Sequence, residues 1–233
     1  MKGRQIEKAT PFPPADPLIL LQEGAAALGL ELSPQAQEQF REYLAQLQLW
    51  NARINLTAVK TDHDIVIKHF LDSLAVLPLL GDIPSLADLG SGAGFPGLPL
   101  KLARPEMALT LVEARQKKAA FLEYMISRLQ LSGVKVENVH LTPLLARQWG
   151  PRFAAVVTRA AFALEIFLPL AGPILLPGGV ALALKGPNLP EGELAGAKKL
   201  ALLHGLGPME LISYNLPITR EPRLAARTSR QSA

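Results

Sequence analysis

Hydrophobic positions follow two different spacings along the chain, and the change falls near residue 80. Before it, apolar side chains recur every three to four positions, as on one face of an amphipathic helix. The clearest stripe consists of Ala36, Phe40, Tyr43, Leu44, Leu47 and Trp50. Ser33 followed by Pro34 is a typical helix start, and Thr61 begins another helix that we expect Pro78 to end. The first 80 residues are therefore predicted to be helical.

From Ser85 onward, short apolar runs alternate with helix-length stretches, which is typical of βαβ units in a parallel sheet covered on both faces. Strands are predicted at 85–89, 108–113, 134–139, 153–158, 180–185, 209–216 and 222–227, and helices at 96–104, 115–131, 143–149, 162–176 and 191–203. The pattern predicts an α/β domain over 81–233 behind an N-terminal helical extension over 1–80, of which 1–15 form a loose arm. Ligands of such sheets bind at the carboxyl ends of the strands.

A glycine-rich stretch, Asp88-Leu89-Gly90-Ser91-Gly92-Ala93-Gly94-Phe95-Pro96-Gly97, follows the first predicted strand. Glycines packed this closely let the backbone turn sharply and approach a ligand. The stretch contains a G-x-G-x-x-G dinucleotide fingerprint, which is a weak signal alone. Asp88 would repel a pyrophosphate, but it suits a ligand with a cationic end, such as the ammonium and sulfonium of S-adenosylmethionine. A purely structural strand-to-helix turn is the alternative.

A second carboxylate, Glu113, ends the next predicted strand, about 20 residues beyond the glycine loop. This placement suits hydrogen bonds from the ribose hydroxyls of an adenosine cofactor. Because NAD and S-adenosylmethionine both contain that ribose, Glu113 does not choose between them. A solvated acid at a strand end is the other explanation.

Composition limits the possible chemistry. The 233 residues are 49% hydrophobic and 19% charged, which is enough for a substantial core. The absence of Cys excludes disulfides, thiolate metal sites and Cys nucleophiles, and the four His lack paired metal-ligand spacing. Apolar stretches stop short of the roughly 18 residues of a membrane span, so we expect a cytoplasmic protein without metal or membrane. The net charge of +4 is compatible with a polyanionic partner without indicating one.

Several short motifs occur together over residues 40–187: Asn55-Leu56-Thr57-Ala58, His69-Phe70-Leu71-Asp72-Ser73-Leu74, the glycine loop, Lys117-Lys118-Ala119-Ala120-Phe121, Thr158-Arg159-Ala160 and Lys185-Gly186-Pro187. In their order and spacing the chain resembles the bacterial ribosomal RNA small-subunit methyltransferase G family, also called the glucose-inhibited division protein B family. The resemblance implies a class I, Rossmann-like methyltransferase fold. It also implies an enzyme that moves a methyl group from S-adenosylmethionine to N7 of a guanine in the decoding-region hairpin of 16S rRNA, in naked RNA or in the small ribosomal subunit. We expect the protein to be a monomer.

The resemblance and the strand ends together suggest roles for single residues. Cofactor contacts are predicted for Asp88, Gly90, Gly92, Gly94, Phe95, Glu113 and Arg159, and RNA contacts for Asn55, His69, Arg115, Lys117, Lys118 and Lys185. Guanine N7 carries a lone pair and no proton at neutral pH, so no acid–base residue is expected, and Arg159 and Lys185 would position the reactants. For these polar residues, structural hydrogen bonds, salt bridges or a solvated surface are the alternatives.

Two segments depart from the family pattern. Leu141-Thr142-Pro143-Leu144 stands where the family usually carries Arg-Ala-Glu, so Thr142, Pro143 and Leu144 are expected to hold the adenine through backbone and apolar contacts. The segment 220–227 lacks the family's final aliphatic strand, so the last sheet position is expected to be short or frayed.

Two other functions remain open at this point. A NAD-dependent oxidoreductase would share the glycine fingerprint, but it would need a substrate domain, and the 136 residues after Gly97 are all assigned to the sheet. A vestigial methyltransferase fold that binds RNA without catalysis is the second alternative.

Overall fold

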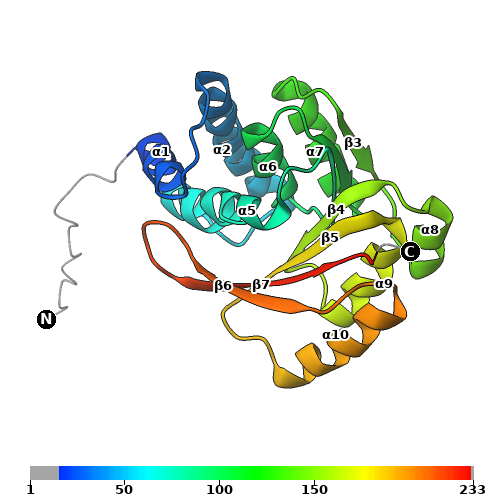
Figure 1. The fold of residues 1–233 in the computed structure, drawn as a ribbon. Coiled ribbons are helices and arrows are strands. Elements are labelled where there is room, and N and C mark those ends of the chain that lie inside the picture. Colours follow the sequence, from blue (N-terminus) through cyan, green and yellow to red (C-terminus); the bar gives the residue numbers. More distant parts are fainter. Residues whose placement is uncertain (1–15, 232–233) are drawn as a thin grey trace, which may run out of the picture.

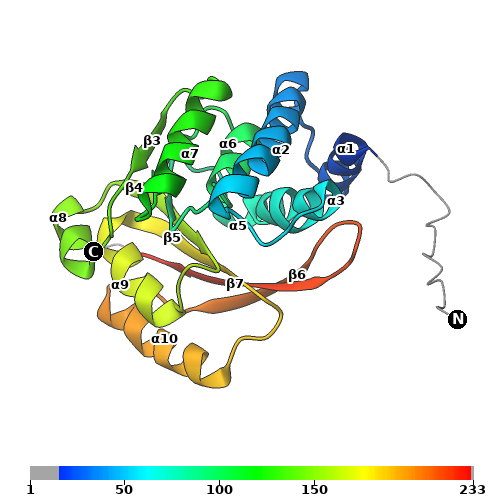
Figure 2. The same cartoon turned by 180° about the vertical axis from the view of Figure 1, so that it is seen from behind.

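A seven-stranded sheet forms the middle layer of the molecule, with helices on both faces (Figures 1 and 2). The structure is a computed structural model and describes residues 16–231. The strands are β1 (Ser85–Leu89), β2 (Ala108–Val112), β3 (Val134–Glu137), β4 (Phe153–Arg159), β5 (Leu175–Lys185), β6 (Glu210–Asn215) and β7 (Pro222–Ser229). Their order is β3-β2-β1-β4-β5-β7-β6, and β7 runs antiparallel to its two neighbours. The predicted mostly parallel α/β sheet is confirmed.

The helices divide between the two faces of the sheet. One face carries α1 (Pro17–Ala27), α2 (Pro34–Ile54), α3 (Asp62–Ile65), the π-helical turn η1 (Val66–Leu71), α4 (Asp72–Leu74), α5 (Leu77–Leu80), α6 (Gly97–Ala103) and α7 (Gln116–Arg128) (Figure 1). The other carries α8 (Pro143–Trp149), α9 (Leu164–Ile174) and α10 (Glu191–Leu203) (Figure 2).

Alternate residues of the strands supply two separate cores. Leu86, Leu109 and Leu111 belong to the core under α1–α7, whereas Ala87 and Val112 belong to the core under α8–α10. Successive side chains of a strand point to opposite faces, so a strand covered on both sides is apolar throughout. This is why the predicted runs read as continuous hydrophobic stretches.

The N-terminal helices share their core with the sheet. Phe40 and Tyr43 of α2 pack on Phe70 of η1, with ring centroids 5.0 and 5.2 Å apart, and Tyr43 stacks on Phe95 of the glycine loop at 5.4 Å. Such aromatic pairs contribute about 0.5–1.5 kcal/mol beyond the area they bury. The helical extension is thus joined to the glycine loop by packing. The predicted arm at 1–15 lies outside the described residues.

Two boundaries in the helical part differ from expectation. Pro78 does not end a helix but lies in the first turn of α5, where its missing N–H needs no partner. The helix predicted from Asp62 runs without a break through α3, η1 and α4 to Leu74, short of Leu77, and contains a π-helical turn in its middle. Such turns are often found at functional sites, and His69 lies in this one.

The expectation of a short or frayed last strand is wrong. β7 has eight residues and lies inside the sheet between β5 and β6. Small buried residues, Ala225 and Ala226, replace large aliphatic ones, and Arg227 reaches across to donate from Nε to the Leu79 carbonyl at 3.0 Å. Because neighbouring strands on both sides satisfy its backbone, the segment forms a strand without an aliphatic run.

Candidate active site

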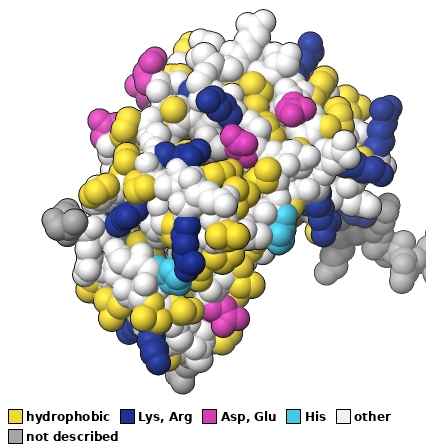
Figure 3. All heavy atoms as spheres, turned by 90° about the vertical axis from the view of Figure 1, so that its right-hand side faces the viewer, with side chains coloured by type: hydrophobic (Ala, Val, Ile, Leu, Met, Phe, Trp, Pro, Cys, Tyr) yellow, Lys and Arg dark blue, Asp and Glu magenta, His cyan; other side chains and the backbone are white. Residues whose placement is uncertain are grey.

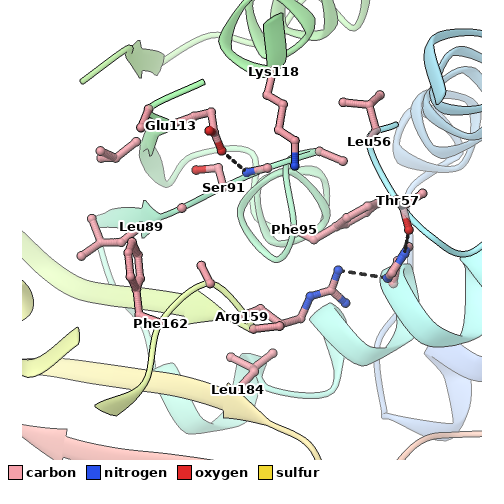
Figure 4. Close-up of a pocket in the computed structure, with 18 of the residues that line it drawn as sticks. Leu56, Thr57, Leu89, Ser91, Phe95, Glu113, Lys118, Arg159, Phe162 and Leu184 are labelled. Atoms are coloured by element: carbon pink, nitrogen blue, oxygen red, sulfur yellow. Dashed lines mark hydrogen bonds between the residues drawn. The ribbon is translucent and has the colours of Figure 1, made fainter. Parts of the chain in front are cut away.

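A cavity of about 990 Å³ opens where β1, β2, β4 and β5 end. Strand order reverses between β1 and β4, the switch point at which ligands of open α/β sheets bind. The glycine loop, the start of α7, the loop after β4 and η1 supply its walls (Figure 4). Its volume is at the upper end of the roughly 300–1,000 Å³ typical of small-molecule pockets.

Glu113 ties the glycine loop to the start of α7. Its Oε2 accepts the N–H of Gly92 at 2.9 Å, and its Oε1 accepts the N–H of Arg115 at 2.7 Å. The residue is only 6% exposed, yet it lines the cavity (Figure 4). A carboxylate has about four lone-pair sites, so two acceptor positions are left for hydroxyl groups of a ligand.

The glycines of the loop are used in different ways. Gly90 and Gly92 line the cavity with φ of 71° and 60°, a region in which side chains are strained. A Cβ on Gly90 would lie 2.5 Å from the Cβ of Ala161, so the two loops approach each other with no room for a side chain. Gly94 does not line the cavity, because it faces Leu98 and the hydroxyl of Tyr43 instead.

Tyr43 fixes the loop from the helical side. The residue is fully buried, and its hydroxyl donates to the Ala93 carbonyl at 2.5 Å. The sequence pattern identified Tyr43 only as part of an apolar stripe, because periodicity reports burial and not the partner of a hydroxyl group.

Asp88 lies beneath the loop and is not part of the cavity wall, so its predicted cofactor contact stays a prediction. It is fully buried, and Oδ2 accepts the N–H of Gly97 at 2.9 Å. Within the described residues, Oδ1 is the one buried side-chain nitrogen or oxygen atom without a hydrogen-bond partner. Burial raises the pKa of Asp88 to about 7, although the Gly97 N–H and Arg159 oppose the shift. Asp88 therefore holds the start of α6 against the end of β1.

Arg159, at the end of β4, is the centre of a polar network. Its Nη1 donates to the Lys68 carbonyl at 2.9 Å and to Oδ2 of Asp72 at 3.3 Å, and its guanidinium lies 4.9 Å from the centre of the Phe95 ring. Asp72 also accepts the hydroxyl of Tyr214 at 2.9 Å, which connects the network to β6. The Arg159 side chain is 13% exposed, so these contacts are shielded from water.

His69 lies between Arg159 and the N-terminal segment. Its ring stacks on Phe95 with centroids 4.6 Å apart; Nδ1 lies 3.0 Å from Nη2 of Arg159, and Nε2 lies 2.7 Å from Oγ1 of Thr57. Burial, together with the charge of Arg159, lowers the pKa of His69 to about 3. The ring is neutral at physiological pH, and both nitrogens are engaged, so it is not placed to act as a general base.

The loop after β4 is held by an ion pair. Lys185 donates from Nζ to Oε1 of Glu193 at 2.8 Å and to the Phe162 carbonyl at 3.0 Å, and Glu193 also accepts the N–H of Leu164 at 2.8 Å. The Lys185 ammonium lines the cavity and is also bound within the protein, and its predicted RNA contact stays a prediction. Ala160 in this loop has φ of 54°, an uncommon conformation for a residue with a side chain.

The structure brings most of the predicted site residues together. The cavity wall includes Gly90, Gly92, Phe95, Glu113, Arg159, His69, Arg115, Lys118 and Lys185. Lys118 extends toward the glycine loop, and Gly92 would place a Cβ 3.9 Å from its Nζ (Figure 4). Lys117 does not line the cavity, and neither does Asn55, which ends α2 in the left-handed conformation.

The residues predicted to hold the adenine are not among those that line the cavity. Thr142, Pro143 and Leu144 lie outside the cavity: Thr142 caps α8 by accepting the Leu145 N–H at 3.2 Å, and Leu144 is 66% exposed. The residues just before them, Val139, His140 and Leu141, line the cavity instead. Helix α8 begins at Pro143 and turns the chain away, a boundary that Thr142 followed by Pro143 already signalled.

Sequence reasoning missed Phe162, whose ring lies beside Gly90 (Figure 4), and it quoted Thr57 only within a motif. Both residues lie in loops, and the sequence does not predict the path of a loop. Figure 3 shows Lys and Arg side chains scattered among apolar ones on one face, with no single basic patch. Among residues 16–231, no group of three or more His, Asp or Glu is arranged to hold a metal, and none of the helices is long and apolar enough to cross a membrane.

Comparisons with known proteins agree with this arrangement. A family model described as rRNA small subunit methyltransferase G matches residues 36–218. The ribosomal RNA small subunit methyltransferase G of Deinococcus radiodurans is 42% identical over 209 residues, which cover 88% of this chain and 81% of that protein. The protein of the same name from a Geobacter species is 36% identical over 204 residues, covering 88% and 93%.

Solved structures share the fold at much lower identity. An O-methyltransferase from Bacillus cereus in complex with SAH has a TM-score of 0.57 and 15% identity, covering 81% of this chain and 91% of that one. A ribosomal protein L11 methylase from Lactobacillus delbrueckii has a TM-score of 0.50 and 16% identity, covering 70% and 78%. These likenesses show the fold, which is that of methyltransferases dependent on S-adenosylmethionine.

Proposed function

Because the chain belongs to the ribosomal RNA small-subunit methyltransferase G family, we propose that it methylates small-subunit ribosomal RNA with S-adenosylmethionine, at N7 of a guanine in the decoding-region hairpin of 16S rRNA. The observation that supports this most directly is the Glu113 carboxylate in the cavity wall, joined to Gly92 of the glycine loop. A non-catalytic RNA-binding protein or a NAD-dependent oxidoreductase is not favoured by the family.

The cavity suits S-adenosylmethionine. Glu113 has acceptor capacity left for the two ribose hydroxyls, and Gly90 and Gly92 leave the loop backbone accessible beside it. The side chains of Val139 and Leu141 offer apolar contact for the adenine. When bound, the cofactor supplies a methyl group on an electron-poor sulfonium sulfur.

The other end of the cavity is suited to the target base. Phe95, His69 and Arg159 surround it, which combines ring faces with a guanidinium group. A base must leave its stack to enter such a pocket, at a cost of a few kcal/mol, and ring faces offset part of that cost. The protein needs no base for this reaction, because guanine N7 has an in-plane lone pair and no proton. Its residues act by positioning, which contributes roughly 7–11 kcal/mol when reacting atoms are held about 3–3.5 Å apart.

Arg159 has the central positioning role in this proposal. Its guanidinium is fixed by Lys68 and Asp72 and keeps a positive charge beside the base pocket. Arg115 and Lys118 line the opposite wall, where phosphate oxygens of the RNA are suitable partners. Since ribosomal RNA is the substrate, we expect the protein to work in the cytoplasm; that it acts as a monomer stays a prediction.

Methyl transfer from labelled S-adenosylmethionine to small ribosomal subunits lacking the modification tests this function. Chemical strand cleavage at N7-methylguanine then maps the labelled position. We expect one labelled guanine in the decoding-region hairpin. Cofactor binding without RNA labelling, or label at another atom or position, would contradict the proposal.

A further inference from the structure

We propose that the hydroxyl group of Thr57 donates a hydrogen bond to an acceptor oxygen of the RNA substrate, either O6 of the target guanine or an adjacent phosphate oxygen. This rests on the proposed function, because it takes an RNA nucleotide as the occupant of this end of the cavity. The donors already directed at the Thr57 oxygen lead to this assignment.

Arg159 determines which nitrogen of His69 carries the proton. A guanidinium group has only donors, and Nη2 of Arg159 lies 3.0 Å from Nδ1 of His69, so Nδ1 accepts. The Lys68 carbonyl, also 3.0 Å from Nδ1, accepts from Nη1 of the same guanidinium at 2.9 Å. Because the ring is neutral, its single proton is on Nε2, which lies 2.7 Å from Oγ1 of Thr57. His69 therefore donates to Thr57.

Thr57 then has no acceptor capacity left. Its Oγ1 accepts from Nε2 of His69 and from the N–H of Val59 at 3.1 Å. A hydroxyl oxygen has two lone pairs and one proton, so both lone pairs are used and the remaining O–H donates. No acceptor within the described residues receives this proton, and Thr57 lines the cavity (Figure 4). The N–H of Thr57 is fixed separately, by Oδ1 of Asn51 at 2.8 Å.

The surroundings favour an RNA oxygen as the acceptor. On guanine, O6 is next to N7 on the major-groove edge, so a donor to O6 would orient N7. A phosphate oxygen is the other acceptor, because Lys68, Arg159 and Arg223 also line this end of the cavity. A hydroxyl whose lone pairs are both filled accepts no further hydrogen bond, so it suits these acceptor oxygens and not the donor N–H groups of a base.

The first test compares Thr57→Val, which removes the hydroxyl, with Thr57→Ser, which keeps it. In single-turnover methyl transfer we expect Thr57→Val to be about 10–100-fold slower and Thr57→Ser to stay within about threefold of wild type. Affinity for S-adenosylmethionine should change less than about twofold in both. Thr228→Val is the control, because it also removes a hydroxyl hydrogen bond, to the Gly207 carbonyl at 2.8 Å, but outside the cavity.

Replacing the target guanine by 2-aminopurine, which has N7 but no O6, identifies the acceptor. If Thr57 donates to O6, Thr57→Val slows this substrate by no more than about threefold; if it donates to a phosphate, the full 10–100-fold effect remains. A Thr57→Val protein that methylates guanine at the wild-type rate overturns the inference alone. A wild-type protein that binds the cofactor but leaves the RNA unlabelled overturns the proposed function, and the inference with it.

Discussion

Glu113→Gln tests whether one carboxylate both holds the glycine loop and binds the cofactor ribose. Both Glu113 oxygens accept backbone N–H groups, from Gly92 at 2.9 Å and from Arg115 at 2.7 Å. Glutamine has the same size, but its amide nitrogen only donates, so one of these two N–H groups would face another donor. The amide nitrogen also cannot accept the hydrogen bond from a ribose hydroxyl that the replaced carboxylate oxygen would accept.

The size of the effect follows from the two lost bonds. Hydrogen bonds to charged groups contribute about 1.5–3 kcal/mol each. Losing the ribose bond therefore costs about 1.5–3 kcal/mol of binding, which is a roughly 10–10²-fold increase in Kd, whereas the loop bond is already made without cofactor and does not change the binding energy directly. The loop bond alone also lowers the stability of the free protein, by about 1.5–3 kcal/mol.

Titration calorimetry with S-adenosylmethionine and thermal unfolding of the free protein measure these two quantities separately. Glu137→Gln is the matched control, because Glu137 ends the neighbouring strand β3 and does not line the cavity. A Kd for Glu113→Gln within about threefold of wild type, or an equal loss in the control, would refute the reasoning. Direct ribose contact is tested with an analogue that lacks the ribose hydroxyls: it should bind wild type much less tightly, with little further loss in the variant.

Three further predictions concern positioning groups. Tyr43→Phe leaves the buried Ala93 carbonyl without its donor, so we expect a loss of about 1–3 kcal/mol of stability and weaker cofactor binding, by thermal unfolding and calorimetry; no change in either would contradict this. The raised pKa of Asp88 means that the folded protein keeps a proton that the unfolded chain releases between about pH 4 and 7. Between pH 5 and 7 the free energy of unfolding of wild type should therefore fall by about 2 kcal/mol relative to that of Asp88→Asn, as measured by denaturant titration. Unfolding free energies that change in parallel with pH in the two proteins would contradict this. Lys185→Gln and Glu193→Gln should slow single-turnover methyl transfer to a similar extent, and the double variant should be no slower than either single variant, because the two side chains form one ion pair. A far larger effect of Lys185→Gln would instead indicate that Lys185 contacts the substrate.

The local pattern of the sequence determined the sheet and the place of the site. Apolar runs of strand length after Ser85 predicted the strands because side chains buried on both faces must be hydrophobic. The closely spaced glycines and Glu113 predicted the place of the cavity, because a sharp glycine turn after one strand and a carboxylate at the end of the next are typical of a nucleotide-cofactor site. These features depend on nearest neighbours along the chain, which a sequence displays directly.

Only the tertiary structure decided what each polar side chain touches. The sequence does not show that Lys185 pairs with Glu193, or that the glycine loop covers Asp88. The Arg-rich segment of β7 became an interior strand because β5 and β6 satisfy its backbone on both sides. A hydrogen bond between Arg159 and His69 joins residues 90 positions apart, and its strength depends on distance and burial. Neither quantity is encoded in local periodicity. The sequence therefore predicts the fold, but it does not predict the hydrogen bonds and ion pairs of the site.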